Sequence, residues 1–357
     1  MAAMPQEVVD ARLGRVTRAI YEYLEKTQED GRRAHLGASL IGKPCRRQVW
    51  YTWRWAKNIK HEGRLLQLFK TGHLAEPRFI DDLKAIGAQV VSHDENGQQF
   101  RFTAHGGHFA GSLDGVATGL PYAPKTWAVL EFKTHSHKSF LTLVSKGVKI
   151  AKPEHYSQMQ IYMLEMGLDR ALYLAKDKDK DEMHDEWITL DKPFAEAEKA
   201  KALAIIQADI PPAGVAAEPG AFECKFCDFK DLCFGEQVPE PTCRSCAHAT
   251  PVLDRPQPDG SGTWACARWE SDIPLDAQRA GCGGHRYIPI FLANVAEPQD
   301  YHNGDVVYRV RKNGKLFANG EGPAAFSSAE IHACPDKAGI PIAGELKGMF
   351  PTAKIIG

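Results

Sequence analysis

The sequence predicts an α/β fold in which a mixed central sheet is flanked by helices, followed by a small cysteine-rich C-terminal domain. Two observations predict this arrangement. Segments with helical spacing of apolar residues surround a central region in which short β-type runs alternate with turn residues. The chain also has nine cysteines, and all but Cys334 fall into two sets with the spacing of metal ligands.

Helices are expected where apolar residues recur at helical spacing and Gly or Pro marks an end. They are residues 8–26, 46–55, 65–86, 153–166 and 194–208. The segment after Cys45 mixes arginines with Trp50, Trp53 and Trp55, so it could face DNA or form a buried helix. We favour the buried helix, because aromatic runs in globular domains are usually core. Strands are expected at residues 89–91, 100–103, 111–116, 128–133, 171–174 and 186–190.

Composition and charge narrow the class of protein. The apolar content of 43% suffices for a packed core. The formal charge of −1, from 44 Lys and Arg against 45 Asp and Glu, argues against coating nucleic acid by bulk charge. No apolar run approaches membrane-spanning length, and Glu7 and Asp10 occupy the place where a secretory signal would be basic. We therefore expect a cytoplasmic protein without a membrane partner.

Asp114, Glu131 and Lys133 form a candidate catalytic set. Hydrolysis of a phosphodiester uses divalent cations, and oxygen ligands suit Mg²⁺ or Mn²⁺. Asp114 and Glu131 lie on neighbouring expected strands and can converge on one ion, with the Phe132 carbonyl as a backbone ligand. Glu131 and Lys133 point to the same face of a strand, so Lys133 could orient water or stabilise charge on the phosphate.

Such an Asp and Glu-x-Lys pattern alone usually marks a surface salt bridge. Here Glu131 ends the apolar run of residues 128–130, where a carboxylate without a partner would be costly to bury. Gln158 and Tyr162 add a second signal, because they lie four residues apart on one face of an expected helix and could reach Lys133 or a DNA phosphate. A polar helix that only packs on the sheet is the simpler alternative.

With these residues the chain resembles the RecB-like exonucleases of the PD-(D/E)XK superfamily, whose pattern is an Asp, then Glu-x-Lys, then a helix with Gln-x3-Tyr. The resemblance covers residues 36 to 235 or so and implies a restriction-endonuclease-like core. It also implies an upstream metal ligand on a helix. Many relatives have a His four residues after a glycine, and this chain has Glu76 at that place and His73 directly after the glycine. Glu76 is favoured as the ligand, and His73 is the alternative.

The resemblance implies metal-dependent hydrolysis of DNA, with exonucleolytic cutting expected, in recombination, repair or phage genome processing. The expected setting is the cytoplasm of a bacterial cell or a phage-infected host, with a recombinase, a helicase or a single-strand-binding protein as a partner. A catalytically silent DNA-binding or assembly subunit is the rival. The presence of Asp114, Glu131 and Lys133 argues against it. An iron–sulfur redox protein is a third alternative, for which the sequence offers no substrate pocket.

The first cysteine set joins distant parts of the chain. Thiolates bind zinc as well as iron–sulfur clusters, so the residue type alone does not decide between them. One distant cysteine plus a C-x2-C-x5-C group resembles the [4Fe–4S] site of the iron–sulfur branch, which includes CRISPR-associated adaptation nucleases and phage exonucleases. The four residues are Cys45, Cys224, Cys227 and Cys233. A structural role is expected, because such a long loop is costly to close.

The second set predicts a zinc module. Its members are Cys243, Cys246, Cys266 and Cys282, with His285 and His248 as spare ligands. The fourth ligand stays open. We expect a nuclease domain at residues 1–238, a zinc-binding module at 239–290 after a Pro-Glu-Pro linker, and a small β-rich region of unknown role at 291–357.

Overall fold

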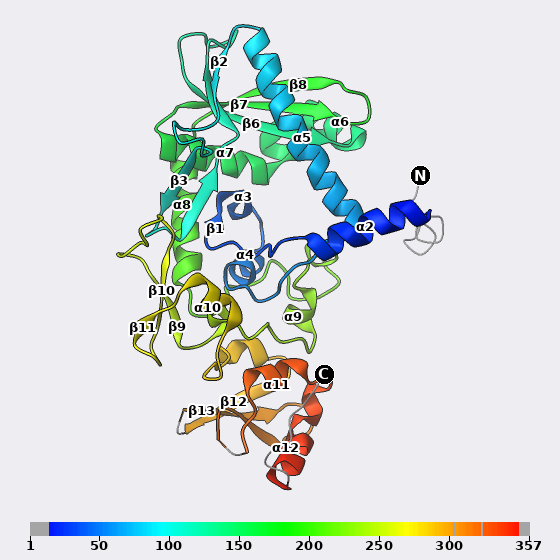
Figure 1. The fold of residues 1–357 in the computed structure, drawn as a ribbon, viewed down its shortest axis with the longest axis vertical. Coiled ribbons are helices and arrows are strands. Elements are labelled where there is room, and N and C mark those ends of the chain that lie inside the picture. Colours follow the sequence, from blue (N-terminus) through cyan, green and yellow to red (C-terminus); the bar gives the residue numbers. More distant parts are fainter. Residues whose placement is uncertain (1–13, 303, 323, 350–357) are drawn as a thin grey trace.

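The computed structural model describes residues 14–302, 304–322 and 324–349, and its centre is a five-stranded sheet in the order β2-β5-β6-β7-β8 (Figure 1). The strands are β2 (Gln89–Val91), β5 (Gly115–Thr118), β6 (Ala128–His135), β7 (Arg170–Asp177) and β8 (Met183–Thr189). β6 and β7 run parallel, whereas the other neighbouring pairs run antiparallel. The predicted mixed α/β fold is thereby confirmed.

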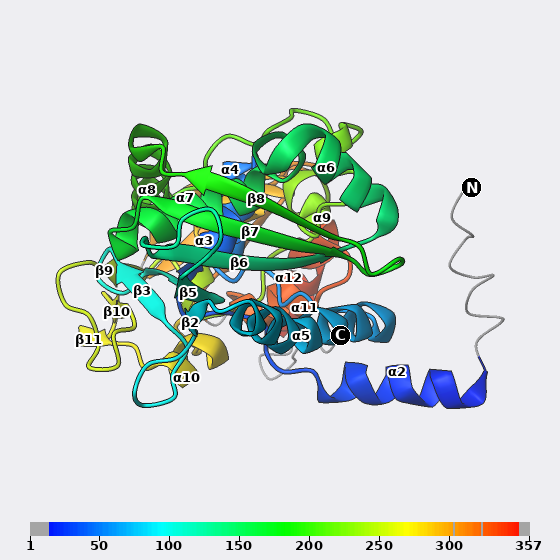
Figure 2. The same ribbon diagram turned by 90° about the horizontal axis from the view of Figure 1, so that it is seen from above.

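Helices cover both faces of this sheet (Figure 2). α5 (Gly63–Ala85) lies on one face, and α6 (His137–Ala151), α7 (Pro153–Met166) and α8 (Lys192–Gln207) lie on the other. Successive side chains of a strand alternate between faces, so Leu130 and Phe132 pack with Phe79 of α5. The rings of Phe79 and Phe132 stack with their centroids 5.0 Å apart. Glu131 is consequently directed to the α7 face.

A second, smaller sheet includes a short strand from the N-terminal segment. β1 (Leu36–Gly37) pairs in parallel with β4 (Phe109–Ser112), which pairs antiparallel with β3 (Arg101–Ala104). The helices of this region are α2 (Arg15–Thr27), α3 (Ala38–Ile41) and α4 (Arg46–Trp53). α4 is a buried helix, with Trp50 and Trp53 at most 2% exposed. Its burial excludes a DNA-facing role for these two indoles.

The region after α8 consists of short elements. Those before residue 290 are η1 (Phe222–Cys224), α9 (Lys230–Phe234), η2 (Cys243–Ser245), β9 (Ala249–Val252), β10 (Thr263–Cys266), β11 (Ser271–Asp272) and α10 (Leu275–Ala280). Those that follow are η3 (Pro289–Leu292), β12 (Ala296–His302), β13 (Asp305–Val310), β14 (Leu316–Asn319), α11 (Ser328–Ala333), η4 (Lys337–Gly339) and α12 (Ile340–Met349). β9 to β11 and β12 to β14 each form a three-stranded sheet.

An arginine–tryptophan cluster joins the expected zinc module to the N-terminal segment. The guanidinium of Arg244 lies over the rings of Trp55, Trp53 and Trp264, at 3.8, 4.7 and 4.8 Å from their centroids. It donates to the Ala34 carbonyl at 2.7 Å. Residues on both sides of the expected boundary at 238 therefore share one core. The three-part division stays a prediction, but the structure adds tight contacts across its first boundary.

Several expected elements differ in their bounds. The expected strand 111–116 is divided between β4 and β5, with Asp114 in the turn between them. α6 was not expected from the sequence. The expected helix 8–26 corresponds to α2 from Arg15 onward, and residues 8–13 lie outside the described residues. No helix in the described part of the chain is long and apolar enough to cross a membrane.

We expect that a chain ending at Pro241 is less stable than the intact protein. It lacks Arg244 and Trp264, which pack on Trp53 and Trp55, and the loss of one buried Trp costs about 3–5 kcal/mol. The measurement is urea unfolding followed by tryptophan fluorescence. A truncated chain with the same midpoint and slope as the intact protein would show that the two parts fold independently.

Candidate active site

Glu131 is the buried centre of the candidate site. It lies in β6, fully buried, on the face covered by α7. One carboxylate oxygen, Oε2, accepts a hydrogen bond of 3.3 Å from Gln158 Nε2. The other, Oε1, pairs with the ammonium group of Lys133 but makes no well-oriented hydrogen bond among the described residues. The structure thus brings together Glu131, Lys133 and Gln158, which the sequence analysis had selected from two separate motifs.

Tyr162 links this centre to β4. Its hydroxyl accepts from Gln158 Nε2 at 3.0 Å and donates to the Ser112 carbonyl at 2.7 Å. Gly111 makes this approach possible, because a Cβ atom there would lie 2.6 Å from Tyr162 Cε1. Gln158 and Tyr162 therefore fix both the carboxylate of Glu131 and the end of the strand that precedes Asp114.

Asp114 lies in the turn between β4 and β5. Its Oδ2 accepts a 2.7 Å hydrogen bond from the backbone N–H of Phe132, directly after Glu131. The carbonyl of Phe132, the expected backbone ligand, accepts from Lys133 Nζ at 3.1 Å. Asp114 is thus held against the same segment of β6 that carries Glu131 and Lys133.

The expected upstream ligands lie on α5. Burial raises the pKa of Glu76, and the negative charge of Asp114 raises it further, while His73 and Lys133 act in the opposite direction. Glu76 therefore lies within electrostatic range of Asp114 and Lys133. Glu76 is half-buried, whereas His73 is exposed. Of the two alternatives, Glu76 is the better placed.

The electrostatics of the site follow from burial and from like charge. Burial raises the pKa of Glu131 to about 7; Lys133 opposes this rise, while Asp114 and Glu76 add to it. Burial alone would lower the pKa of Lys133, but the carboxylates of Glu131, Asp114 and Glu76 together raise it. Three carboxylates close to one ammonium leave an excess of negative charge, which a divalent cation would balance.

The donor set fits Mg²⁺ or Mn²⁺. Carboxylate oxygens are the ligands that these hard cations prefer, and the buried Glu131 Oε1 lacks a regular hydrogen bond. Within the described ranges, no three His, Cys, Asp or Glu side chains already stand in a metal-holding arrangement. Binding would therefore require Asp114, Glu131 and Glu76 to adjust their side chains around the ion.

A cluster of histidines beside Lys133 was missed in the sequence analysis. The hydroxyl of Tyr173, which pairs in register with Glu131, lies 2.9 Å from His135 Nε2 and 2.8 Å from His155 Nδ1. Burial lowers the pKa of His135 to about 4 and that of His155 to about 3, so both are neutral at pH 7. The sequence did hold a signal, because His135 follows Lys133 by two residues and so shares its face of the strand.

The first cysteine set is gathered near the start of α4. Cys45 caps this helix, and Cys224, Cys227 and Cys233 lie in or beside η1 and α9. Burial raises the pKa of Cys227, with smaller contributions from Cys45 and Cys224, and Cys227 in turn raises that of Cys233. The four thiols are therefore electrostatic neighbours, although the arrangement described is not yet that of a metal site.

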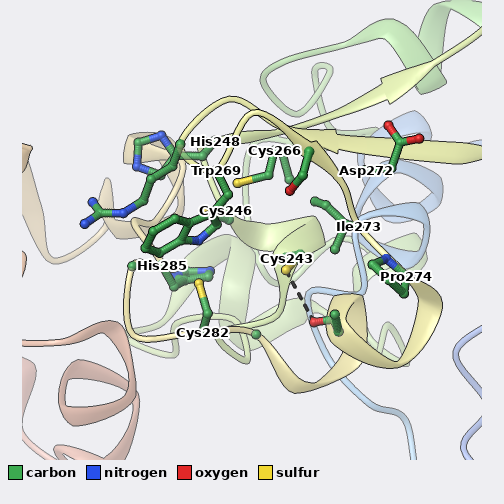
Figure 3. Close-up of a pocket in the computed structure, with 16 residues that line it drawn as sticks. Cys243, Cys246, His248, Cys266, Trp269, Asp272, Ile273, Pro274, Cys282 and His285 are labelled. Carbon is green, nitrogen blue, oxygen red and sulfur yellow. Dashed lines mark hydrogen bonds between the residues drawn. The ribbon is translucent and has the colours of Figure 1, made fainter.

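The second cysteine set lines a cavity of about 180 Å³ (Figure 3). Burial raises the pKa of Cys243 to about 12, and Cys246, Cys282 and Cys266 each add to the rise. His285 lies beside them and is 2% exposed. Its Nδ1 has no hydrogen-bond partner among the described residues, so the imidazole remains an alternative ligand. Here too, no three ligands of the described part are in a coordinating arrangement.

The chain was compared with known proteins, and the solved structures that it resembles are remote from it in sequence. No family model matches the sequence, and no curated protein matches it. An alkaline exonuclease (LHK-Exo) from Laribacter hongkongensis is 16% identical with a TM-score of 0.36, over 49% of this chain and 87% of that chain. LHK-Exo in complex with dAMP is 15% identical with a TM-score of 0.35, over 49% of this chain and 88% of that chain. SSO0001 is 15% identical with a TM-score of 0.33, over 62% of this chain and 96% of that chain. Likenesses this low carry no conclusion about fold or activity.

The raised pKa of Glu131 predicts a pH dependence of stability. In the folded metal-free protein this carboxyl keeps its proton up to about pH 7, whereas its ordinary pKa is 4.5. The folded state then binds more protons than the unfolded state between these values, so stability falls as pH rises through this window, by up to about 3 kcal/mol. Glu131→Gln should remove this fall.

The measurement is urea unfolding of both proteins in EDTA from pH 4.5 to 8. Because buried histidines also titrate in this range, the relevant quantity is the difference between wild type and Glu131→Gln at each pH. A difference that does not change with pH would contradict the raised pKa.

Proposed function

We propose that this protein is a Mg²⁺- or Mn²⁺-dependent nuclease that hydrolyses phosphodiester bonds in DNA, with the PD-(D/E)XK core and RecB-like pattern that the sequence resembles. The observation that carries the proposal is the contact of Glu131 with both Lys133 and Gln158. Asp114 is tied to the same strand through the Phe132 N–H. Residues from β6, α7 and the β4–β5 turn thus meet at one point, as the resemblance requires.

The residues of the site have three different roles in this proposal. Asp114, Glu131 and Glu76 hold the cation, which when bound neutralises phosphate charge and lowers the pKa of water. Lys133 donates to the attacking water or to a phosphate oxygen, and its positive charge is maintained by the surrounding carboxylates. Gln158 and Tyr162 act as positioning residues, because they hold Glu131 and the end of β4.

We further propose that Cys45, Cys224, Cys227 and Cys233 bind a [4Fe–4S] cluster with a structural role. α4 and the segment around α9 already contact each other. The rings of Tyr51 and Phe229 are 5.5 Å apart, and Lys57 Nζ donates to the Asp228 carbonyl at 3.1 Å. A cluster at this place would link two segments almost two hundred residues apart and restrict the unfolded chain.

Exonucleolytic cutting in recombination, repair or phage genome processing belongs to the same proposal, with DNA as substrate and a recombinase, helicase or single-strand-binding protein as partner. The support is the sequence resemblance to RecB-like exonucleases. The rival, a silent DNA-binding subunit, would bind DNA without consuming it. Incubation of end-labelled linear DNA and closed circular DNA with Mg²⁺ or Mn²⁺ separates the two.

Lys133→Ala should lower the rate of DNA cleavage by about 10²- to 10³-fold, the usual effect of removing one transition-state donor. Lys138→Ala is the matched control, because Lys138 is an exposed lysine on α6 and its loss should leave the rate unchanged. The measurement is single-turnover cleavage of end-labelled linear DNA in Mg²⁺ and in Mn²⁺. A Lys133→Ala protein with the wild-type rate would overturn the assignment of Lys133.

Anaerobically purified protein should contain about four irons and absorb in the visible range. Cys224→Ser should lose both iron and stability, whereas Cys334→Ser should lose neither, because the Cys334 thiol lies elsewhere and donates to the Asp336 carbonyl at 3.1 Å. Iron analysis and thermal unfolding of the three proteins provide the measurement. Stoichiometric zinc in place of iron at these four cysteines would disprove the cluster.

A further inference from the structure

Two arginines are buried side by side, and the carboxylate charge of Asp209 acts on Arg54 without forming an ion pair with it. Arg54 is 2% exposed and Arg244 is fully buried. Within residues 14–302, 304–322 and 324–349, no carboxylate forms an ion pair with either guanidinium. Arg54 donates to the carbonyls of Arg244, Ala249 and Ala208, and Arg244 donates to those of Trp53 and Ala34 and to Gln278 Oε1.

Carbonyl and aromatic contacts do not supply a counter-charge. A buried cation costs several kcal/mol unless an opposite charge lies nearby, and two adjacent cations also repel each other. Both guanidiniums lie over the Trp264 ring, at 5.2 Å for Arg54 and 4.8 Å for Arg244. Stacking on aromatic rings offsets part of this cost but adds no negative charge. Beyond the charge of Asp209, which acts on Arg54, some further negative charge is therefore expected close to this pair.

The cysteine cavity is the neighbouring structure that can provide it. Arg244 stands between Cys243 and Cys246 in the chain, and the Ala249 carbonyl that accepts from Arg54 belongs to a residue lining the cavity. Gln278, which accepts from Arg244, also donates to the carbonyl of Ile273, another lining residue. Arg54 thus bonds a lining residue directly, and Arg244 is connected to the lining through Gln278.

The cavity gathers the side chains that a thiolate metal site uses. Figure 3 shows Cys243, Cys246, Cys266 and Cys282 gathered around it from separate segments. Cys243 and Cys246 bracket a tight turn closed by a 3.1 Å bond from Cys246 N–H to the Cys243 carbonyl. The backbone N–H of Arg286 points at Cys246 Sγ at 3.5 Å, as donors do around a thiolate. None of these cysteines forms a disulfide.

We propose that Cys243, Cys246, Cys266 and Cys282 bind one zinc ion as thiolates, and that this centre provides the counter-charge for the buried Arg54 and Arg244. Four thiolates around Zn²⁺ leave a net charge of about −2, opposite in sign to the two guanidiniums. Three thiolates and the His285 imidazole would leave only about −1, so the four-cysteine set supplies the larger counter-charge. Zinc then stabilises the core shared with α4, beyond its own module.

The Cys243 thiol would have to exchange one partner for another on binding zinc. The Cys243 thiol now donates to the Ala277 carbonyl at 3.4 Å, a weak bond that a metal–thiolate bond readily replaces. The proposal does not depend on nuclease activity or on the iron–sulfur cluster, because its ligands and its charged neighbours are different residues.

The experiment measures zinc and iron together in the full chain. Wild-type protein should contain about one zinc, and Cys243→Ser, Cys266→Ser and Cys282→Ser should each release zinc to a colorimetric chelator at least tenfold faster, with iron content unchanged. Cys334→Ser is the control. Protein that keeps its iron but carries no zinc, or single variants that hold zinc as tightly as wild type, would overturn the site.

Cobalt substitution tests the ligand set. Thiolate-to-cobalt charge-transfer intensity should correspond to four thiolates and fall in Cys282→Ser. An unchanged spectrum in Cys282→Ser, together with a changed one in His285→Ala, would replace the four-cysteine set with three cysteines and His285.

A third measurement tests the counter-charge. Removing zinc should lower the melting temperature of wild type more than that of Arg54→Met, a variant of similar side-chain length with one buried cation fewer. Equal losses in the two proteins would show that the centre does not balance these charges. Arg54→Gln repeats the comparison if Arg54→Met does not fold.

Discussion

The rest of the site depends on the buried carboxylate of Glu131, which needs polar partners inside the protein. A charge in the middle of a sheet is costly unless paired, and here Lys133 and Gln158 are the groups that reach it. Gln158 reaches Glu131 because α7 packs on the face of β6 to which Glu131 points. Tyr162, one turn further along the same helix, then fixes the end of β4 through the Ser112 carbonyl. The geometry around the carboxylate therefore depends on the packing of one helix on one strand.

The position of Asp114 likewise follows from packing against β6. The antiparallel pairing of β5 with β6 brings Gly115 opposite Leu130, so the residue just before β5 lies beside the N–H of Phe132. That hydrogen bond holds one carboxylate next to another. Burial raises the pKa values of Glu131 and Glu76, and the neighbouring negative charge of Asp114 adds to both rises. In our account the site is an electrostatic arrangement that only a cation completes.

Local patterns predicted much of this arrangement. The expected helix 153–166 has the same bounds as α7, because Pro153 and Gly167 mark its ends clearly. The alternation of side chains along a strand predicted that Glu131 and Lys133 share one face of β6, where the two side chains pair. The split of residues 111–116 into two strands was missed, because apolar pattern alone does not show that Asp114 leaves the strand to accept a backbone hydrogen bond. α6 was missed as well, and its non-helical Gly147 interrupts the helical pattern.

Long-range packing was the part that the sequence could not reveal. Nothing local to Arg244 indicates that its guanidinium inserts between Trp53 and Trp55, almost two hundred residues earlier. The linker signal at Pro239 to Pro241 suggested an independent module, whereas the structure joins that module to α4. Likewise, Tyr173 bridges His135 and His155 from different elements, which the parallel pairing of β6 with β7 and the packing of α7 bring about together.

The most direct test of the central claim is to count bound Mn²⁺ by electron paramagnetic resonance, because it does not depend on finding the right DNA substrate. Wild-type protein titrated with Mn²⁺ at pH 8 should show a saturable site that is lost in Asp114→Asn and in Glu131→Gln but retained in Lys138→Ala. Binding should also weaken below about pH 7, as the Glu131 carboxyl takes up its proton. Equal Mn²⁺ binding in wild type and Glu131→Gln would contradict the assignment of this carboxylate cluster as the metal centre.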